Sequence, residues 1–226
     1  MSAAPHLAVQ IAGETLWLLA DRALYWPAEQ TLLIADAHLG KAATYRTLGQ
    51  PVPRGTTARN LQRLDELLAS YPTRRLVFLG DLLHARPARV GTTLAALLAW
   101  RTRHAELRMV LIRGNHDRSA GDPPAELAIE VVSEPWCMGP FALCHEPLDC
   151  PGLHVLAGHL HPVFVLRGRG RDRVRMPCFS VEPHITLLPA FGEFTGGMAI
   201  GTAPERCLYG TLDGGVWPLS LGISAV

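Results

Sequence analysis

The sequence predicts a single layered α/β domain spanning residues 1–226, and three observations lead to this prediction. Short apolar runs typical of buried strands alternate along the chain with segments whose apolar residues recur at helical spacing. Hydrophobic residues make up 48% of the chain, enough to bury a large core. The length of 226 residues suits one domain, because α/β folds reach ~200–250 residues as one unit.

The first elements are expected to be a hairpin and a buried strand. Leu7–Ile11 and Thr15–Ala20 lie on either side of Gly13 and are predicted to pair with each other. Thr31–Ala35 is a compact apolar run of the kind buried in a sheet, and it ends at Asp36.

Helices and further strands follow in alternation. Thr56–Tyr71 carries leucines at 61, 64, 67 and 68, which form one apolar stripe on a helix, and Pro72 ends it. Thr92–His104 is predicted to be a second helix. After Val163 the pattern changes to strands and turns. The remaining predicted strands are Leu76–Leu79, Met109–Ile112, Phe141–Cys144 and Val155–Ala157.

Composition and cysteine usage exclude several classes of protein. The formal net charge is +1, so an anionic substrate must be attracted by a local feature. The five cysteines form no C-x-x-C pair, which argues against a disulfide framework or a zinc ribbon. We see neither a secretory signal nor an apolar run long enough to span a membrane, so we expect a cytoplasmic protein without a membrane partner.

Five of the apolar runs end in polar side chains that can bind metals. Ligands of open α/β sheets bind beyond the carboxyl ends of the strands, so these side chains can meet in one site. Taken singly, each motif is also explained by a turn or a packed histidine, but their joint occurrence indicates a site. The motifs are Asp36-Ala37-His38, Gly80-Asp81-Leu82-Leu83-His84, Gly114-Asn115-His116-Asp117, His145-Glu146 and Gly158-His159-Leu160-His161.

These side chains suit a pair of divalent metal ions. Carboxylate, amide oxygen and imidazole are ligands for Mn²⁺, Fe or Zn²⁺. Residues two apart on an extended segment point the same way, so Asp36 and His38 are expected to reach one metal. His159 and His161 either do likewise or divide between two metals across a turn. Asp81 is the best candidate for a carboxylate bridge.

Two such ions suit phosphoryl transfer. Ions ~3.5–4 Å apart clamp the attacking and leaving oxygens of a phosphate ester and generate hydroxide near neutral pH. His116 is then the candidate acid that protonates the leaving oxygen, with Asp117 placed to orient or charge it. The sequence therefore predicts hydrolysis of a phosphate ester by a metal-bound hydroxide.

An arginine-rich stretch follows the last motif. Arg167, Arg169, Arg171, Arg173 and Arg175 alternate with other residues. They share one face if the stretch is extended, and they cluster at a tip if Gly168 and Gly170 form a hairpin. Such a cationic patch can bind phosphate backbones, although a solvated surface hairpin explains it as well.

The five motifs resemble those of the calcineurin-like metallophosphoesterase superfamily. The resemblance covers about residues 31–161 and implies a four-layer α/β/β/α sandwich with two central mixed sheets. It implies that Asp36, His38 and His161 hold one metal and that Asp81 bridges to a second. Asn115, His145 and His159 would hold the second metal, and His116 would be the leaving-group acid. His84 departs from the pattern, which usually has Asp or Gly there.

The longer motifs resemble one subgroup, the ligase-associated DNA damage response endonucleases. Asp36-Ala-His-Leu-Gly-Lys41, Arg113-Gly-Asn-His-Asp-Arg118 and the late segment Leu188-Pro-Ala-Phe-Gly-Glu-Phe-Thr-Gly196 carry this resemblance. It implies a manganese-dependent DNA endonuclease or phosphodiesterase acting beside an ATP-dependent DNA ligase, a helicase and an exonuclease. The candidate substrate-binding residues are His84, Arg86, Arg118, Arg169, Arg171 and Arg173.

Two alternatives to a DNA nuclease stay open. The same chemistry can act on a cyclic nucleotide, another small phosphodiester or a phosphomonoester. A protein of this fold can also be a non-catalytic scaffold, but the complete ligand set argues against that. The sequence does not fix the oligomeric state, and a homodimer is compatible with it.

Overall fold

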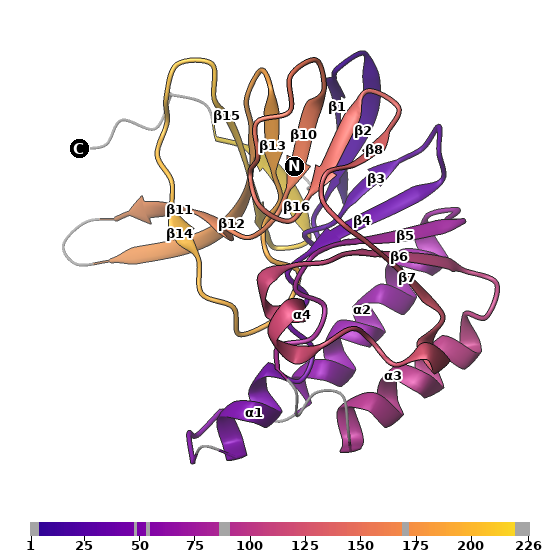
Figure 1. The fold of residues 1–226 in the computed structure, drawn as a ribbon. Helices are drawn as coiled ribbons and strands as arrows, with labels where there is room; N and C mark the ends of the chain where they lie inside the picture. Colours follow the sequence, from indigo (N-terminus) through magenta and orange to yellow (C-terminus); the bar gives the residue numbers. More distant parts are fainter. Residues whose placement is uncertain (1–4, 48, 53–54, 86–90, 169–171, 220–226) are drawn as a thin grey trace.

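The structure is a computed structural model that describes residues 5–47, 49–52, 55–85, 91–168 and 172–219. Its strands form two mixed β-sheets, and its longer helices lie against the first sheet (Figure 1). The predicted α/β fold with two mixed sheets is confirmed. None of the described helices is long and apolar enough to cross a membrane.

The strands of the first sheet lie side by side in their sequence order. The first four strands pair antiparallel, and the last four pair parallel, so the carboxyl ends of β4 to β7 lie at one edge. The predicted strand boundaries agree closely with those observed, whereas β3 and β7 were not predicted. The strands are β1 (His6–Ile11), β2 (Glu14–Leu19), β3 (Leu24–Trp26), β4 (Thr31–Ala35), β5 (Arg75–Leu79), β6 (Arg108–Ile112) and β7 (Ile129–Val132).

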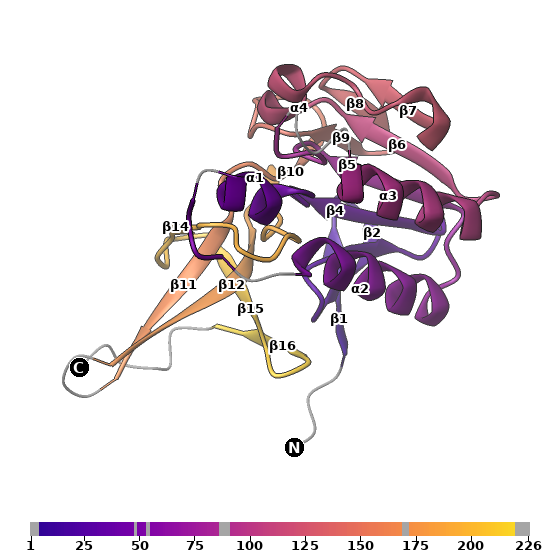
Figure 2. The ribbon, with the colours of Figure 1, turned by 90° about the horizontal axis from the view of Figure 1, so that it is seen from below.

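Helices cover one face of this sheet. Helix α2 buries the predicted stripe of Leu61, Leu64 and Leu67, and α3 packs beside it through Leu97 and Trp100. Figure 2 shows both helices lying across the strands of the first sheet. The helices are α1 (Lys41–Thr47), α2 (Thr56–Ser70), α3 (Gly91–Arg103) and α4 (Asn115–Ala120), followed by the short 3-10 helix η2 (Ala125–Leu127).

The second sheet is built from the rest of the chain. Its central strands β9, β10 and β13 are parallel to one another, and β11 and β12 form an antiparallel hairpin. The strands are β8 (Trp136–Met138), β9 (Phe141–Cys144), β10 (His154–Ala157), β11 (Pro162–Arg167), β12 (Arg173–Val181), β13 (Ile185–Leu187), β14 (Met198–Ala199), β15 (Cys207–Leu212) and β16 (Gly215–Pro218).

The core between the sheets follows from the alternation of side chains along each strand. In β4, Leu32 and Ile34 face the helices, whereas Leu33 and Ala35 face the second sheet. Phe141 and Leu156 of the second sheet belong to the same core as Leu33. Because β4 is buried on both faces, its residues from Leu32 to Ala35 are all apolar, which is why this strand could be predicted from the sequence.

The outer face of the second sheet is covered differently from the expected helix layer. Cys144, Val155 and Leu187 pack there against Leu153 and Leu160, which lie outside the strands. In the described residues the connection from β9 to β10 contains no helix. Pro147 and Pro151 fall within this short connection, and a proline removes the amide that a helix interior requires.

Candidate active site

The five predicted motifs meet where the carboxyl ends of five strands come together. Strands β4, β5 and β6 of the first sheet lead to Asp36, Asp81 and Asn115. Strands β9 and β10 of the second sheet lead to His145 and His159. The site therefore lies at the junction of the two sheets, and each sheet supplies part of it.

The backbone at the site is turned rather than extended. Asp36 and His38 have φ values of 53° and 43°, and His159 and His161 have φ values of 66° and 48°. The expectation of an extended Asp-x-His segment was therefore wrong, since β4 ends just before its motif, whereas a turn at His159 and His161 was one of the two arrangements expected there. Left-handed φ values in residues other than glycine cost ~1–3 kcal/mol, and such strain clusters at functional sites.

Asp36, His38 and His161 form the first group of side chains. Their candidate ligand atoms all lie within 4.8 Å of one another. His161 Nδ1 lies 3.3 Å from the carbonyl oxygen of Gly196 and donates to it, which leaves Nε2 facing Asp36 Oδ1 at 3.2 Å. Asp36 Oδ1 is buried and has no hydrogen-bond partner, whereas Oδ2 accepts the amide of His159. A cation would satisfy this carboxylate oxygen.

Asn115, His145 and His159 form the second group. His145 Nδ1 donates to the carbonyl oxygen of Leu79 at 3.1 Å, so the neutral ring carries a lone pair on Nε2. That nitrogen lies 2.8 Å from Asn115 Oδ1 and 3.0 Å from His159 Nδ1. Acceptor atoms so close together repel one another unless a proton or a cation lies between them. Fixing a histidine through its other nitrogen is the usual arrangement of a metal ligand.

Asp81 lies between the two groups. Its Oδ1 is 3.6 Å from His145 Nε2, and its Oδ2 is 3.7 Å from His38 Nε2. One oxygen thus faces each group, as a bridging carboxylate requires. Ligands ~2.0–2.2 Å from one ion lie roughly 3–4 Å from one another, so these separations fit a pair of metal ions.

Two glycines let the segments approach closely. A Cβ atom at Gly80 would overlap the ring of His145, and Gly80 has a φ of 78°. A Cβ atom at Gly158 would lie 2.6 Å from Asp36 Oδ2. Glycine at these positions lets a strand end pass directly beside a metal-binding side chain.

Burial sets the protonation of the site. Burial lowers the pKa of His38 to about 2, and repulsion from Lys41 and neighbouring histidines adds to this effect. Burial also raises the pKa of Asp81, while His145 acts in the opposite direction. His38 is therefore neutral and has a lone pair to offer a metal.

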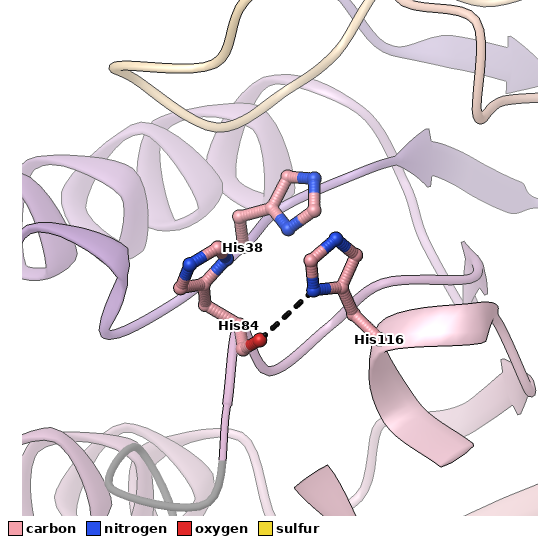
Figure 3. Close-up of side chains that lie close together, drawn as sticks. All are labelled: His38, His84 and His116. Atoms are coloured by element: carbon pink, nitrogen blue, oxygen red, sulfur yellow. Dashed lines mark hydrogen bonds between the residues drawn. The ribbon is translucent and has the colours of Figure 1, made fainter. Parts of the chain in front are cut away.

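A second cluster of histidines flanks the site. The rings of His84 and His116 stack with centroids 5.0 Å apart, and Tyr45 stacks on the other side of His84 at 5.7 Å. His116 Nδ1 donates to the carbonyl oxygen of His84 at 3.0 Å, as Figure 3 shows. His116 Nε2 is then left 4.0 Å from Asp81 Oδ2, on a side chain that is 38% exposed.

His84 has a position close to the metal-binding side chains. With His38 and His116 it forms a group whose candidate ligand atoms lie within 4.8 Å of one another. Burial lowers the pKa of His84 to about 4, and its buried Nδ1 has no hydrogen-bond partner. A neutral imidazole at this position can accept a hydrogen bond or contribute a ligand.

Asp117 has a different neighbourhood from the predicted one. Its carboxylate accepts the backbone amides of Gly114 at 3.0 Å and Leu83 at 3.2 Å, and it is fully buried. The ring of His116 is bonded to His84 instead. These hydrogen bonds of Asp117 thus do not include the ring of His116, and the prediction that Asp117 orients or charges His116 stays a prediction. Asp117 fastens the start of α4 to the loop after β5.

Glu134 is a functional residue that sequence reasoning missed. Its Oε2 accepts the amides of His145 at 2.8 Å and Glu146 at 3.0 Å, and its Oε1 pairs with Arg118 at 3.1 Å. Arg118, predicted to bind substrate, is thus engaged in holding the His145 segment. No spacing in the sequence points to Glu134, which lies in the turn between β7 and β8.

Lys41 is a second residue that was not assigned a role. It begins α1 directly after the first motif. Burial lowers the pKa of Lys41, and attraction to Asp36 and Asp81 acts in the opposite direction. The motif Asp36-Ala-His-Leu-Gly-Lys41 was the available signal, because it places a cation within one turn of the ligands.

The arginine stretch forms a hairpin rather than one extended segment. Arg167 of β11 pairs directly with Arg173 of β12, and Arg175 faces Val165. All three arginines are exposed. Like charges directly opposite each other on neighbouring strands destabilise a hairpin. The predicted substrate-binding residues Arg86, Arg169 and Arg171 lie outside the described residues.

The fold and the site define a class of enzyme. A sequence model of the calcineurin-like phosphoesterase family matches residues 30–182, which is more than half of the chain. The chain therefore belongs to the calcineurin-like phosphoesterase family, and it is a metal-dependent hydrolase of phosphate esters.

Among solved structures, the chain is similar to the nuclease MPE of Pseudomonas putida. The two share 54% sequence identity over 95% of this chain and 100% of that one, with a TM-score of 0.85. Yfce, a phosphoesterase from E. coli, is 17% identical over 79% of this chain and 86% of that one, with a TM-score of 0.38. A comparison with curated proteins gives no match.

Proposed function

We propose that this chain is a two-metal endonuclease that hydrolyses phosphodiester bonds in DNA. The observation that carries the proposal is that metal-binding atoms of side chains from both sheets lie around the carboxylate of Asp81. In this proposal Asp36, His38 and His161 hold one ion, and Asp81 bridges to the other. Asn115, His145 and His159 hold the second ion.

In the proposed mechanism the metal ions and His116 have different roles. When bound, two divalent ions supply the Lewis acidity that neutralises phosphate charge and lowers the pKa of water. His116 has its Nδ1 hydrogen fixed by the carbonyl of His84, so its exposed Nε2 is free to carry a proton to the leaving oxygen. The carboxylate of Asp81 lies 4.0 Å from that nitrogen, which places His116 next to the proposed metal site.

Nucleic acid as substrate is supported by two observations. The hairpin of β11 and β12 carries the opposed pair Arg167 and Arg173, which can bind the phosphates of a nucleic-acid backbone. The structure that is 54% identical over nearly the whole chain is described as a nuclease. A small phosphoester would need no such cationic extension, although the metal site would accept it equally well.

Manganese and a role in ligase-associated repair complete the proposal. Nitrogen and oxygen ligands without thiolates suit Mn²⁺, and they also accept Fe or Zn²⁺. The repair role, with an ATP-dependent DNA ligase, a helicase and an exonuclease as partners, rests on the resemblance of the motifs alone. Co-purification of these enzymes with the tagged chain would test it, and their absence would remove this part of the proposal.

The test of the proposed function compares a polymer with a small diester. Metal-stripped protein is incubated with added Mn²⁺ on single-stranded DNA and on bis-p-nitrophenyl phosphate, with Asp81→Asn as the variant. We expect the wild type to hydrolyse both substrates and the variant to hydrolyse neither, because the amide cannot bridge two ions as a carboxylate does.

The two ways in which this test can fail have different meanings. Full activity of Asp81→Asn, with a thermal unfolding curve like that of the wild type, would overturn the two-metal arrangement. Hydrolysis of the small diester with the DNA left intact would keep the metal site and make the enzyme a phosphodiesterase of small molecules.

A further inference from the structure

We infer that Phe194 is a stacking platform for a nucleobase next to the cleaved phosphate. The inference rests on the proposed action on nucleic acid and adds a specific contact to it. Phe194 lies in the segment between β13 and β14, which begins beyond the part of the chain matched by the family model. It lies within the late segment 188–196 that carries the subgroup resemblance, but it is not among the candidate site residues predicted from the sequence.

The segment is attached to the metal-binding groups on both sides of Phe194. The amide of Gly192 donates to the carbonyl oxygen of Asp36 at 3.0 Å. The carbonyl oxygen of Gly196 accepts from His161 Nδ1 at 3.3 Å. Phe194 is two residues from each of these contacts, and two residues span at most ~7 Å. Its backbone is therefore held at the rim of the site.

Further contacts make the segment a firm support. The amide of Glu193 donates to Asn60 Oδ1 at 3.3 Å, and the carboxylate of Glu193 pairs with Arg59 at 2.7 Å. On the other side of Phe194, the hydroxyl of Thr195 donates to the carbonyl of Gly192 at 3.1 Å. The guanidinium of Arg175 donates to the carbonyl of Gly197 at 2.6 Å.

The exposure of Phe194 is unusual for a phenylalanine. Its side chain is 50% exposed, whereas Phe141, Phe179 and Phe191 are completely buried. Its φ of 66° lies in the left-handed region, which a bulky side chain adopts only at a cost. The left-handed backbone and the exposed apolar ring each lower the stability of the folded protein. A ligand that covers the ring would account for both costs.

The chemistry of the neighbourhood points to a nucleobase as that ligand. Each phosphodiester of a nucleic acid is flanked by bases, and every base has a π-face on which an aromatic ring can stack. Arg175 of β12 donates to the carbonyl of Gly197 and so brings positive charge to the same segment, three residues from Phe194. An aromatic platform with a nearby cation is how proteins bind single strands without reading their sequence.

The test compares a strand that has bases with one that lacks them. The substrates are an oligothymidylate, an abasic strand of the same length, and bis-p-nitrophenyl phosphate, each with Mn²⁺. The variants are Phe194→Ala, Phe194→Leu and Phe194→Tyr. Trp217→Ala is the matched control, because Trp217 is the other exposed large aromatic residue among the described residues, is 41% exposed and lies on β16.

We expect Phe194→Ala to raise the KM for oligothymidylate about tenfold, within the range of base–aromatic stacking. The abasic strand and the small diester should be hydrolysed as by the wild type. Phe194→Tyr should restore binding, and Phe194→Leu should restore it only in part, because leucine is apolar without a π-face.

Other outcomes would overturn the inference. An equal loss on the abasic strand or the small diester would make Phe194 a support for the metal site. An unchanged KM for oligothymidylate, or an equal effect of Trp217→Ala, would remove the stacking contact. If the wild type cuts the small diester and neither strand, the nuclease proposal itself fails, which the wild type reveals without any variant.

Discussion

The metal-binding groups and the arginine hairpin are built by opposite rules. The side chains of Asp36, Asp81 and His145 are at most 3% exposed, and the buried Oδ1 of Asp36 has no hydrogen-bond partner. Arg167 and Arg173 are exposed on a hairpin and oppose each other across it. The first region is enclosed by the protein, and the second is exposed to molecules that bind from the solvent.

This difference separates catalysis from binding. A change in the buried region should lower kcat or metal affinity for every substrate, because the reacting phosphate of every substrate meets the same atoms. A change in the hairpin should affect only substrates long enough to reach it. Variants in the two regions can test this contrast. It would be weakened if a hairpin variant lowered the hydrolysis of a small substrate.

The largest effect is expected at His116. His116→Ala should lower kcat for DNA by roughly 10²–10⁴-fold, the usual contribution of a general acid. Bis-p-nitrophenyl phosphate should lose much less, because p-nitrophenolate leaves without needing a proton. The measurement is kcat for both substrates at saturating Mn²⁺. An equal loss on both would show that His116 acts through the metal site instead of on the leaving group.

An intermediate effect is expected at Glu134. Glu134→Ala should raise the Mn²⁺ concentration for half-maximal activity by roughly 10–100-fold, because support of metal ligands typically contributes that much. Glu134→Gln should be milder, since its amide oxygen still accepts the amides of His145 and Glu146.

The control for this prediction is Glu130→Ala, which removes an exposed glutamate that pairs with Arg108. It should leave the Mn²⁺ dependence unchanged. Saturating Mn²⁺ should bring the activity of Glu134→Ala back towards that of the wild type. A loss that Mn²⁺ does not relieve would show that Glu134 only stabilises the fold.

The smallest effect is expected in the hairpin. Replacing Arg167 and Arg173 by glutamine should weaken the binding of single-stranded DNA and lower its salt dependence, by ~0.7 in log–log slope for each phosphate that is no longer neutralised. Hydrolysis of bis-p-nitrophenyl phosphate should not change. Arg108→Gln is the matched control, because Arg108 begins β6 at the end away from the site. A fall in small-diester activity would contradict the separation of the two regions.

The sequence predicted the parts of the molecule whose signal is local. Strand β4 was predicted with its observed bounds, because an apolar run ending at a carboxylate is visible in five residues. Helix α2 was predicted because its leucines recur at helical spacing. Helix α4 was not predicted, because its six residues, Asn115–Ala120, contain too few apolar positions to show a helical period.

The parts that could not be predicted depend on contacts between distant segments. The left-handed turns at Asp36 and His159 follow from how the strand ends meet, not from the residues themselves. Glu134 holds the His145 segment across a turn, and any surface glutamate has the same local sequence signal. The hydrogen-bond partners of Asp117 are backbone amides, and no pattern of side chains in the sequence predicts such contacts.

The attachment of residues 190–197 to the first motif affects how the enzyme is made. The amides of Phe191 and Gly192 donate to the carbonyls of Ala35 and Asp36, and Gly196 holds His161. Ribosomes extend a chain at ~5–20 residues per second from its N-terminus. A nascent chain therefore carries the candidate metal-binding side chains before it has the backbone segment that holds Asp36 and His161 in place.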